Sequence, residues 1–444
     1  MSETRPRIEL ATVPTGANRV DAIPAHWGWV AAEVWTPRML TALDEGVKGG
    51  RWYTLMDKVA ALPTLRAAFA RVKANRGAAG VDHMTVAMFA QRLDAHLTTL
   101  SDALRTGTYR PHAIRRHWIP KPGTQERRPL GIPTVRDRVV QTALRLVLEP
   151  IYERDFAAHS YGFRPRRGAK DALRRVTALL RADYVHVVDA DLQAYFDSIP
   201  RAALRARVET KMADGRVLAL LDAFLQQPIF EGLQQTTPEA GTPQGAAISP
   251  LLANLYLDPL DHAMAAAGVE MVRDADDFVV LCRTAEDAQQ ALTTVQRWTQ
   301  AAGLQLHPQK TRVVNMQQPG GVDFLGDHFE RDHRWPRQKS RVKLTDAIRA
   351  KTRRNHGHSL AAIIADVNRT LRGWFEYFKH SHGTFKSEDA WVRMRLRAIL
   401  RRRCGDGHHP DWRDHRRWPK AVFTAQGLFS FTQAHATLRQ SCHR

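Results

Sequence analysis

Apolar residues recur at helical spacing along most of this 444-residue chain, with short strand-like runs between the helical stretches. Leu62, Leu65, Phe69 and Val72 fall three or four residues apart, the period that lines one face of a helix. The same period predicts helices over 137–156, 168–182, 201–227, 248–260, 285–302 and 343–400. Runs rich in β-branched residues, bounded by turn residues, predict strands within 114–133, 184–188, 278–281 and 322–325. After Arg331 we expect helices and no further strand.

Charge divides the chain at the same place. The net charge is +21, from 66 Lys and Arg against 45 Asp and Glu. Residues 331–444 hold 26 basic and 9 acidic residues, whereas residues 1–330 hold 40 and 36. Basic residues interleaved with tryptophans suit a nucleic acid, because cations pair with phosphates and rings stack on unpaired bases. A solvated helical face is the alternative, but the asymmetry favours nucleic acid as the partner.

Composition excludes several other classes of protein. Hydrophobic residues make up 43% of the chain, which is enough to bury the cores of more than one domain. The three cysteines, Cys282, Cys404 and Cys442, are too few and too far apart for a disulfide scaffold. The N-terminus has no apolar signal segment, and no run of 18 apolar residues suggests a membrane span. We therefore expect a cytoplasmic protein without a membrane partner.

Two acidic clusters lie at the ends of strand-like runs, in VHVVDADLQAYFDS (185–198) and MVRDADDFVVLC (271–282). Their aspartates are Asp189, Asp191, Asp197, Asp274, Asp276 and Asp277. The second cluster reads as a β-hairpin with carboxylates at its tip. Carboxylates at the ends of neighbouring strands repel each other unless a cation lies between them. Because such oxygens favour Mg²⁺, the pattern indicates metal-dependent phosphoryl transfer, with ordinary strand-end turns as the alternative.

Three further segments hold candidate substrate contacts. GTPQGAAISPLLANLYLDPL places Gln244 among small residues that allow backbone to approach a substrate closely. IPKPGTQERRPLGIP carries Lys121 and Arg128 on a turn-rich hairpin that suits a triphosphate. Lys310, in GLQLHPQKTR, could protonate a pyrophosphate leaving group. Taken singly, the first segment is ambiguous between a substrate contact and an ordinary loop, and the second fits an exposed basic hairpin equally well. For a lone lysine such as Lys310, a plain surface charge is the more common role.

The order of these segments resembles that of the reverse transcriptase/maturase proteins encoded by bacterial group II introns. The likeness runs from about residue 34 to residue 431. The segments that carry it are NRGAAGVD, RRPLGIPTVRDRVVQ, SYGFRPRRGAKDAL, VVDADLQAYFDSI, GTPQGAAISPLLANLYL, RDADDFVVLC, GLQLHPQKTR, VDFLGDHF, LRGWFEYF and RRWPKAVFTAQGLFSF. A single segment is weak evidence, whereas this many in one order are specific.

The resemblance implies an α+β fold, a right-hand polymerase with an antiparallel palm sheet and an α-helical thumb or maturase domain after it. We expect an N-terminal extension at 1–55, fingers and palm at 56–330, and the helical thumb at 335–412. Residues 413–444 would form a basic C-terminal tail, with no room for the endonuclease domain that some relatives carry.

The resemblance also assigns the catalytic residues. Asp191, Asp276 and Asp277 match the ligands of the catalytic Mg²⁺ ions, and Lys310 matches the palm lysine near the leaving group. The implied activity is RNA-directed DNA polymerisation together with assistance to intron splicing and retrohoming. The implied partners are group II intron RNA, an RNA template with a DNA primer, dNTPs and target DNA.

On the substrate side, Lys121 and Arg128 match cations that bind the triphosphate. Phe196 matches the aromatic residue that excludes a ribose 2′-hydroxyl, and Gln244 matches the glutamine beside the template and the incoming nucleotide. One departure stands out, because the family usually has Tyr-Ala-Asp-Asp at the hairpin and Asp274 takes the place of the tyrosine here. The alternative function is therefore an RNA-binding splicing cofactor with weakened or lost polymerase activity; co-option for host defence or repair leaves no mark in the sequence.

Overall fold

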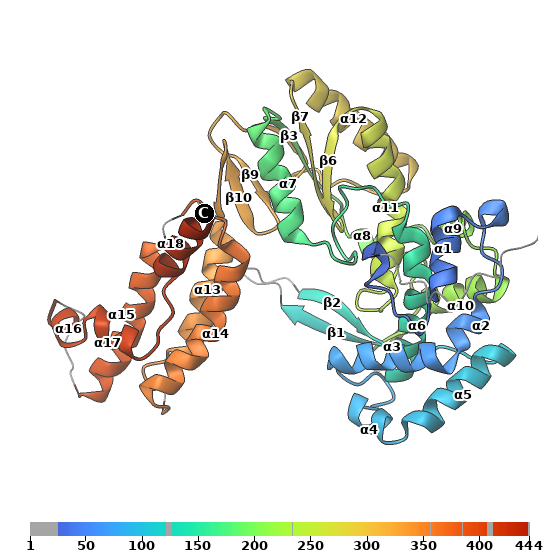
Figure 1. The fold of residues 1–444 in the computed structure, drawn as a ribbon, viewed down its shortest axis with the longest axis horizontal. Coiled ribbons are helices and arrows are strands. Elements are labelled where there is room, and N and C mark those ends of the chain that lie inside the picture. Colours follow the sequence, from blue (N-terminus) through green and yellow to red (C-terminus); the bar gives the residue numbers. More distant parts are fainter. Residues whose placement is uncertain are drawn as a thin grey trace, which may run out of the picture.

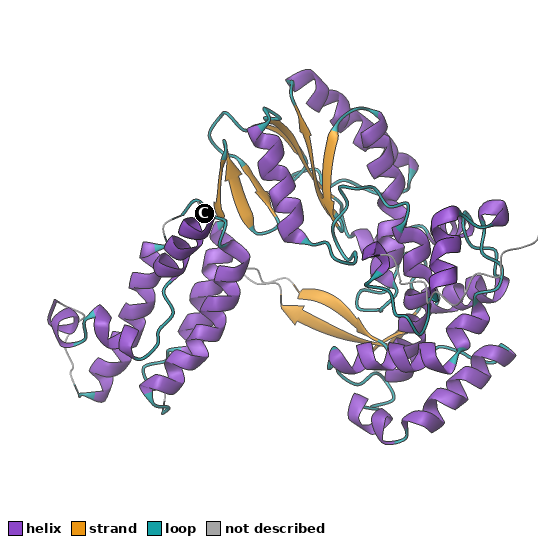
Figure 2. Ribbon diagram, viewed as in Figure 1, coloured by secondary structure: helices purple, strands orange, loops and turns teal. Residues whose placement is uncertain are grey.

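The structure is a computed structural model that describes residues 25–120, 127–232, 234–355, 357–383, 385–405 and 412–442. Figure 1 shows three parts along the chain: N-terminal helices, a middle part built on a sheet, and a C-terminal group of helices. In Figure 2 the strands belong to the middle part and to a hairpin that extends from the N-terminal part. Helices and largely antiparallel sheets followed by a helical part make an α+β fold, which confirms the predicted fold class.

The N-terminal part packs its helices around one apolar core. The elements are η1 (Ala25–Trp27), α1 (Pro37–Glu45), η2 (Lys48–Gly50), α2 (Met56–Ala60), α3 (Leu62–Ala74), α4 (Val86–Gln91), α5 (Leu93–Thr106) and α6 (Val135–Glu153). Trp27 and Trp35 are buried in the core that also contains the apolar face of α6. Trp35 Nε1 donates a hydrogen bond to the carbonyl of Leu146, at 3.1 Å. The described residues of the expected N-terminal extension are thus built into this core.

A hairpin extends from the N-terminal part. Its sheet has the order β2-β1-β4-β5, and the strands are β1 (Ile114–Pro120), β2 (Arg127–Ile132), β4 (Ile229–Glu231) and β5 (Gln234–Thr236). β1 pairs with β2 in antiparallel fashion and with β4 in parallel fashion. The strands predicted within 114–133 are therefore confirmed. The residues that connect β1 to β2, 121–126, lie outside the described residues, and the candidate Lys121 is among them.

The middle part is built on a four-stranded antiparallel sheet in the order β6-β7-β3-β8, named the palm sheet below. Its strands are β3 (His186–Asp191), β6 (Glu270–Asp274), β7 (Asp277–Cys282) and β8 (Arg312–Asn315). The helices are α7 (Ala169–Arg181), α8 (Tyr195–Ser198), α9 (Arg201–Glu209), α10 (Gly215–Leu225), α11 (Ser249–Ala266) and α12 (Ala285–Ala301). Val188 and Val280 pack on the α11 and α12 side, whereas Val187 and Val279 pack on the α7 side. Because both faces of the sheet are buried, β7 is an almost continuous apolar run after Asp277.

A three-stranded sheet joins the palm sheet to the C-terminal helices. Its order is β11-β10-β9, with β9 (Val322–Phe324), β10 (Asp327–Glu330) and β11 (His333–Pro336). The expectation of no strand after Arg331 is wrong, because β11 pairs with β10 across a turn in which Arg331 has a φ of 56°. The sequence of β11, His-Arg-Trp-Pro, is too short and too polar to show a strand pattern by itself. Only its long-range pairing makes it a strand.

The C-terminal part consists, in the described ranges, of helices around a third apolar core. They are α13 (Gln338–Lys351), α14 (Leu360–Phe378), α15 (Lys386–Arg403), α16 (Trp412–Arg417), α17 (Lys420–Ala425) and α18 (Phe431–Cys442). Phe423 and Phe431, from the expected basic tail, are buried in this core. Asp389 on α15 accepts a hydrogen bond from the Phe431 N–H at 2.9 Å. Among the described residues, no helix is long and apolar enough to cross a membrane.

One buried carboxylate connects the N-terminal helices to α10. Asp214 Oδ2 accepts hydrogen bonds from the Leu55 and Met56 N–H groups, at 2.7 and 2.8 Å, and Oδ1 accepts from two N–H groups at the start of α10. Asp214→Ala leaves these donors without their acceptor and should lower the free energy of unfolding by about 2 kcal/mol in a denaturant titration. Asp102→Ala, at an exposed position of α5, is the matched control with a change below about 0.5 kcal/mol. Equal effects of the two substitutions would contradict this role of Asp214.

Candidate active site

The register of the palm sheet brings the two acidic clusters together. Asp191, the last residue of β3, lies directly opposite Asp277, the first residue of β7. Asp277 also pairs with Asp274 across the β6–β7 hairpin, so that Ala275 and Asp276 form its turn. Opposed residues of an antiparallel pair have Cα atoms only about 4.5–5.5 Å apart. The candidate ligands Asp191, Asp276 and Asp277 are therefore neighbours at one end of the sheet.

Burial and mutual repulsion destabilise the ionised carboxylates at this end. The pKa of Asp277 is raised to about 7, first by burial and then by the charges of Asp276, Asp189 and Asp191. The pKa of Asp276 is also raised, chiefly by burial and in addition by Asp191. Carboxylates with raised pKa values gain most from a cation placed between them. The electrostatics of the site thus favour a bound cation.

Basic side chains already lie beside two of the aspartates. Lys310 Nζ is 2.6 Å from Asp191 Oδ2, and Arg312 Nε on β8 is 3.4 Å from Asp189 Oδ2. The Lys310 loop is held in place because the His307 N–H donates to the Asp191 carbonyl, at 2.7 Å. Lys310 therefore lies directly beside Asp191, one of the candidate metal ligands.

The donor chemistry of the site fits Mg²⁺. Among the described residues, no group of three or more Asp, Glu, His or Cys side chains is arranged so that it could hold a metal ion by itself. However, Mg²⁺ is usually bound by one or two carboxylates together with waters and substrate phosphates, so that a closed protein cage is not required. Asp191, Asp276 and Asp277 supply hard oxygen donors from two adjacent strand ends. These residues could hold such an ion.

The candidate substrate contacts within the described residues are linked to one another through the backbone. Arg128, at the start of β2, is close enough that its charge opposes the rise in the pKa of Asp276. Phe196, on α8, accepts a backbone hydrogen bond from Thr242 at 2.7 Å, which attaches it to the loop that contains Gln244. The Gln244 carbonyl accepts from the Gly131 N–H of β2, at 2.6 Å. Backbone hydrogen bonds thus link α8, this loop and the hairpin to one another, and Arg128 of the hairpin is within electrostatic range of Asp276.

Sequence reasoning missed two arginines at the site. Arg273, on β6, is 0% exposed and lies next to the acidic turn. The sequence feature that could have pointed to Arg273 is its place in the first apolar arm of MVRDADDFVVLC, because a charged residue in a buried strand needs a partner. Arg337, immediately before α13, lowers the pKa of Asp277 against the effect of burial. Nothing in the local sequence around Arg337 marks it, because its place depends on the unpredicted strand β11.

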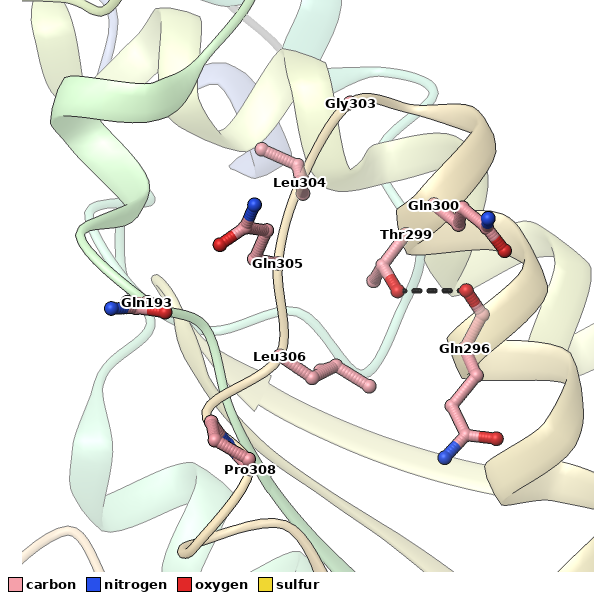
Figure 3. Close-up of a pocket in the computed structure, with 9 residues that line it drawn as sticks. All are labelled: Gln193, Gln296, Thr299, Gln300, Gly303, Leu304, Gln305, Leu306 and Pro308. Atoms are coloured by element: carbon pink, nitrogen blue, oxygen red, sulfur yellow. Dashed lines mark hydrogen bonds between the residues drawn. The ribbon is translucent and has the colours of Figure 1, made fainter.

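A hollow of about 570 Å³ lies behind the β3 end, between the C-terminus of α12 and the 303–308 loop (Figure 3). The Gln193 N–H donates to the Gln305 carbonyl at 2.8 Å, which joins the loop to the end of β3. The residues that line the hollow are Gln193, Gln296, Thr299, Gln300, Gly303, Leu304, Gln305, Leu306 and Pro308. None of them is charged, so the hollow is not suited to bind a metal ion or a triphosphate.

Comparisons with known proteins agree with this geometry. Residues 119–329 match the family described as reverse transcriptase (RNA-dependent DNA polymerase), and residues 341–419 match the group II intron maturase-specific domain. Protein YkfC of Escherichia coli (strain K12) is 32% identical over 333 residues, which are 65% of this chain and 84% of that protein. This chain belongs to the group II intron reverse transcriptase/maturase family. Polymerases of this family generally use divalent metal ions.

Other relatives match over shorter lengths. The group II intron-encoded protein LtrA of Lactococcus lactis is 36% identical over 177 residues, 40% of this chain and 29% of that protein. The chain therefore spans less than a third of the lactococcal protein in this match. A chain of a solved Cas6-RT-Cas1–Cas2 complex covers 57% of this chain and 44% of its own length, at 23% identity and a TM-score of 0.36. That likeness is too weak to support an inference.

The raised pKa of Asp277 predicts a measurable effect on stability. With a pKa of about 7 in the folded state and an ordinary value of 3.8, Asp277 binds its proton more tightly when folded. Its contribution to stability is therefore lost as the pH rises from about 4 through 7. Asp277→Asn removes this cost, and at pH 8 without divalent cations its Tm should exceed that of the wild type by roughly 2–4 °C.

The same thermal melts contain their own control. Near pH 3 the two proteins should have similar Tm values, because the Asp277 carboxyl is then mostly protonated in the folded and the unfolded state alike. Added Mg²⁺ should raise the Tm of the wild type more than that of Asp277→Asn, since a ligand stabilises the state that binds it. A variant that melts at or below the wild type at every pH would show that Asp277 is not destabilised by its neighbours.

Proposed function

We propose that this chain is the RNA-directed DNA polymerase of a group II intron, and that it also binds its intron RNA to assist splicing and retrohoming. The observation that carries the proposal is the register that sets Asp191 opposite Asp277, with Asp276 in the adjoining turn. Such a group of carboxylates suits two-metal-ion nucleotidyl transfer. The substrates are an RNA template, a DNA primer and dNTPs, and the intron inserts into a target DNA.

The catalytic residues have separate tasks in this proposal. Asp191, Asp276 and Asp277 hold Mg²⁺, which when bound activates the primer 3′-hydroxyl and stabilises the pyrophosphate leaving group. The Lys310 ammonium, 2.6 Å from Asp191 Oδ2, is the donor of a proton to the departing pyrophosphate. Arg128 adds positive charge on the side of the hairpin, where it binds the triphosphate.

The remaining candidates select and orient the nucleotide. The ring of Phe196 lies edge-to-face with that of Phe163, at a centroid distance of 6.4 Å. In this position Phe196 excludes a ribose 2′-hydroxyl, and Gln244 contacts the template and the incoming nucleotide. Lys121, which lies outside the described residues, completes the triphosphate contacts.

The C-terminal helices support the RNA-binding half of the proposal. Lys339, Lys343 and Arg353 are exposed on or next to α13, where they can meet phosphates. Arg397 and Arg401 are instead buried, and Arg401 pairs with the buried Asp414. The basic residues of this part therefore have two roles, and only the exposed ones are available to RNA.

Primer extension on an RNA template with dNTPs and Mg²⁺ tests the polymerase directly. The wild type should extend the primer, whereas Asp276→Ala should reduce the rate by at least about 10³-fold because a metal ligand is lost. Glu286→Ala, at an exposed position of α12, is the matched control and should behave as the wild type. If neither the wild type nor any variant extends at any Mg²⁺ concentration, while the protein still binds intron RNA tightly, the polymerase proposal is wrong.

One observation favours the alternative of a splicing cofactor with weakened polymerase activity. Asp274 stands where the family usually has tyrosine, and its pKa is raised by burial and by the charge of Asp276. A third carboxylate at the hairpin increases the repulsion that a metal ion has to overcome.

Asp274→Tyr tests this alternative. The substitution should raise primer extension at low Mg²⁺ concentration and have little effect at saturating Mg²⁺, because it removes one negative charge beside the metal ligands. The measurement is the Mg²⁺ concentration that gives half-maximal extension. An unchanged midpoint would mean that Asp274 does not weaken the site.

A further inference from the structure

The acidic turn rests on a fully buried arginine. Arg273 Nε lies 2.8 and 3.0 Å from the two carboxylate oxygens of Asp261, on α11. Burial tends to lower the pKa of Arg273, but Asp261 raises it, so that the guanidinium stays charged inside the protein. The Nη2 group of Arg273 also donates to Asp261, and the other amino group, Nη1, donates to the Ala275 carbonyl at 2.8 Å. The arginine therefore joins α11 directly to the backbone of the turn.

A buried amide continues the same network. Asn254 lies two helical turns before Asp261 and thus on the same face of α11. Asn254 Oδ1 accepts from Arg273 Nη1 at 3.0 Å, and its Nδ2 donates to the Gly162 carbonyl at 2.7 Å. The side chains of Asn254 and Asp261 are both buried. The oxygen and the nitrogen of the Asn254 side-chain amide each have a partner, so the residue connects the segment around Gly162 to Arg273 and, through it, to the turn.

The backbone of Gly162 lies directly against this turn. A Cβ added at Gly162 would lie 2.2 Å from the Ala275 nitrogen and 2.7 Å from the Asp274 carbonyl carbon. A neighbouring backbone hydrogen bond holds the same two segments together, because the Tyr161 N–H donates to the Arg273 carbonyl at 2.8 Å. Ala275 itself has a φ of 63°, a conformation that a residue with a side chain adopts only when its surroundings hold it there.

We propose that Gly162, Asn254 and Arg273 act together as positioning residues for the turn that carries the two metal-binding aspartates. The proposal rests on the polymerase function proposed above. The backbone of Gly162 packs against the turn, and Arg273 donates a hydrogen bond to the carbonyl of Ala275 in the turn. Asn254 forms hydrogen bonds with both Gly162 and Arg273. In this proposal none of the three contacts a substrate; they act by fixing the positions of Asp276 and Asp277.

The same segment reaches the nucleotide side of the site. Phe163, the residue after Gly162, has a φ of 58°, is 49% exposed, and contacts the ring of Phe196. A shift of Gly162 would therefore move both the aspartates and the aromatic pair.

Gly162→Ala tests the proposal without altering a charged group. Its methyl group forces the turn away from Gly162, and a displacement near 1 Å is enough to slow a chemical step by up to about 100-fold. We expect primer extension with a rate roughly 10- to 100-fold below the wild type and a half-maximal Mg²⁺ concentration raised about 3-fold or more. Binding of RNA should not change, because no residue of the C-terminal helices is affected.

Gly168→Ala is the matched control, six residues further along the same segment. A Cβ at Gly168 meets nothing within 4 Å, and the extended backbone there accepts any residue. The control should therefore extend primers at the wild-type rate and with the wild-type Mg²⁺ midpoint. If Gly162→Ala and Gly168→Ala have the same rate and the same midpoint, the proposal is overturned.

A second readout separates this proposal from the polymerase function. The Mg²⁺-induced rise in Tm should need a higher Mg²⁺ concentration in Gly162→Ala than in the wild type. A wild type that extends no primer overturns the proposed function, and this thermal titration then decides the positioning role alone. If Gly162→Ala does not fold, Asn254→Ala takes its place, since it removes the connection to Gly162 while the Arg273–Asp261 pair remains. Wild-type midpoints for Asn254→Ala would then overturn the proposal.

Discussion

The carboxylates at the ends of β3 and β7 repel each other, and the surrounding structure is arranged to keep them together. Asp191 and Asp277 are opposed by strand register, which a sheet buried on both faces does not allow to slip. The cost of this arrangement appears as the pKa of Asp277, raised to about 7 by burial and by its acidic neighbours. A site of this kind gains its stability from cations, whether metal ions or side chains.

The side-chain cations come from distant parts of the chain. Lys310 and Arg312 come from the segment that ends in β8, Arg128 from the hairpin, and Arg337 from the start of the C-terminal helices. Each reaches the strand ends only when its own element is in place. The electrostatics of the aspartates therefore depend on the hairpin, the palm sheet and the C-terminal part at the same time, which couples these parts to the chemistry.

The sequence predicted those features that local pattern determines. The acidic clusters, the hairpin with its carboxylates, and the long helices follow from β-branched runs, turn residues and helical spacing. The features that it missed depend on contacts between distant residues. β11 is a strand only because it pairs with β10, Trp35 is buried only because α6 lies over it, and Arg273 shows its role only beside Asp261. The need for a glycine at position 162 likewise comes from its close approach to the turn at Ala275, which is far away in the sequence.

If the carboxylates at the ends of the two strands β3 and β7 bind a divalent metal ion at one place, that place can be mapped directly. With hydrogen peroxide and ascorbate added, Fe²⁺ bound in place of Mg²⁺ reduces the peroxide to hydroxyl radicals, which cut the protein backbone near the metal while ascorbate reduces the Fe³⁺ again. The cut positions can be read from the fragment masses. We expect cuts close to Asp191 and to the turn at Asp276 and Asp277, which excess Mg²⁺ suppresses and which are lost in Asp191→Ala. Cuts confined to other segments, or cuts at these two that Mg²⁺ does not suppress, would contradict this expectation.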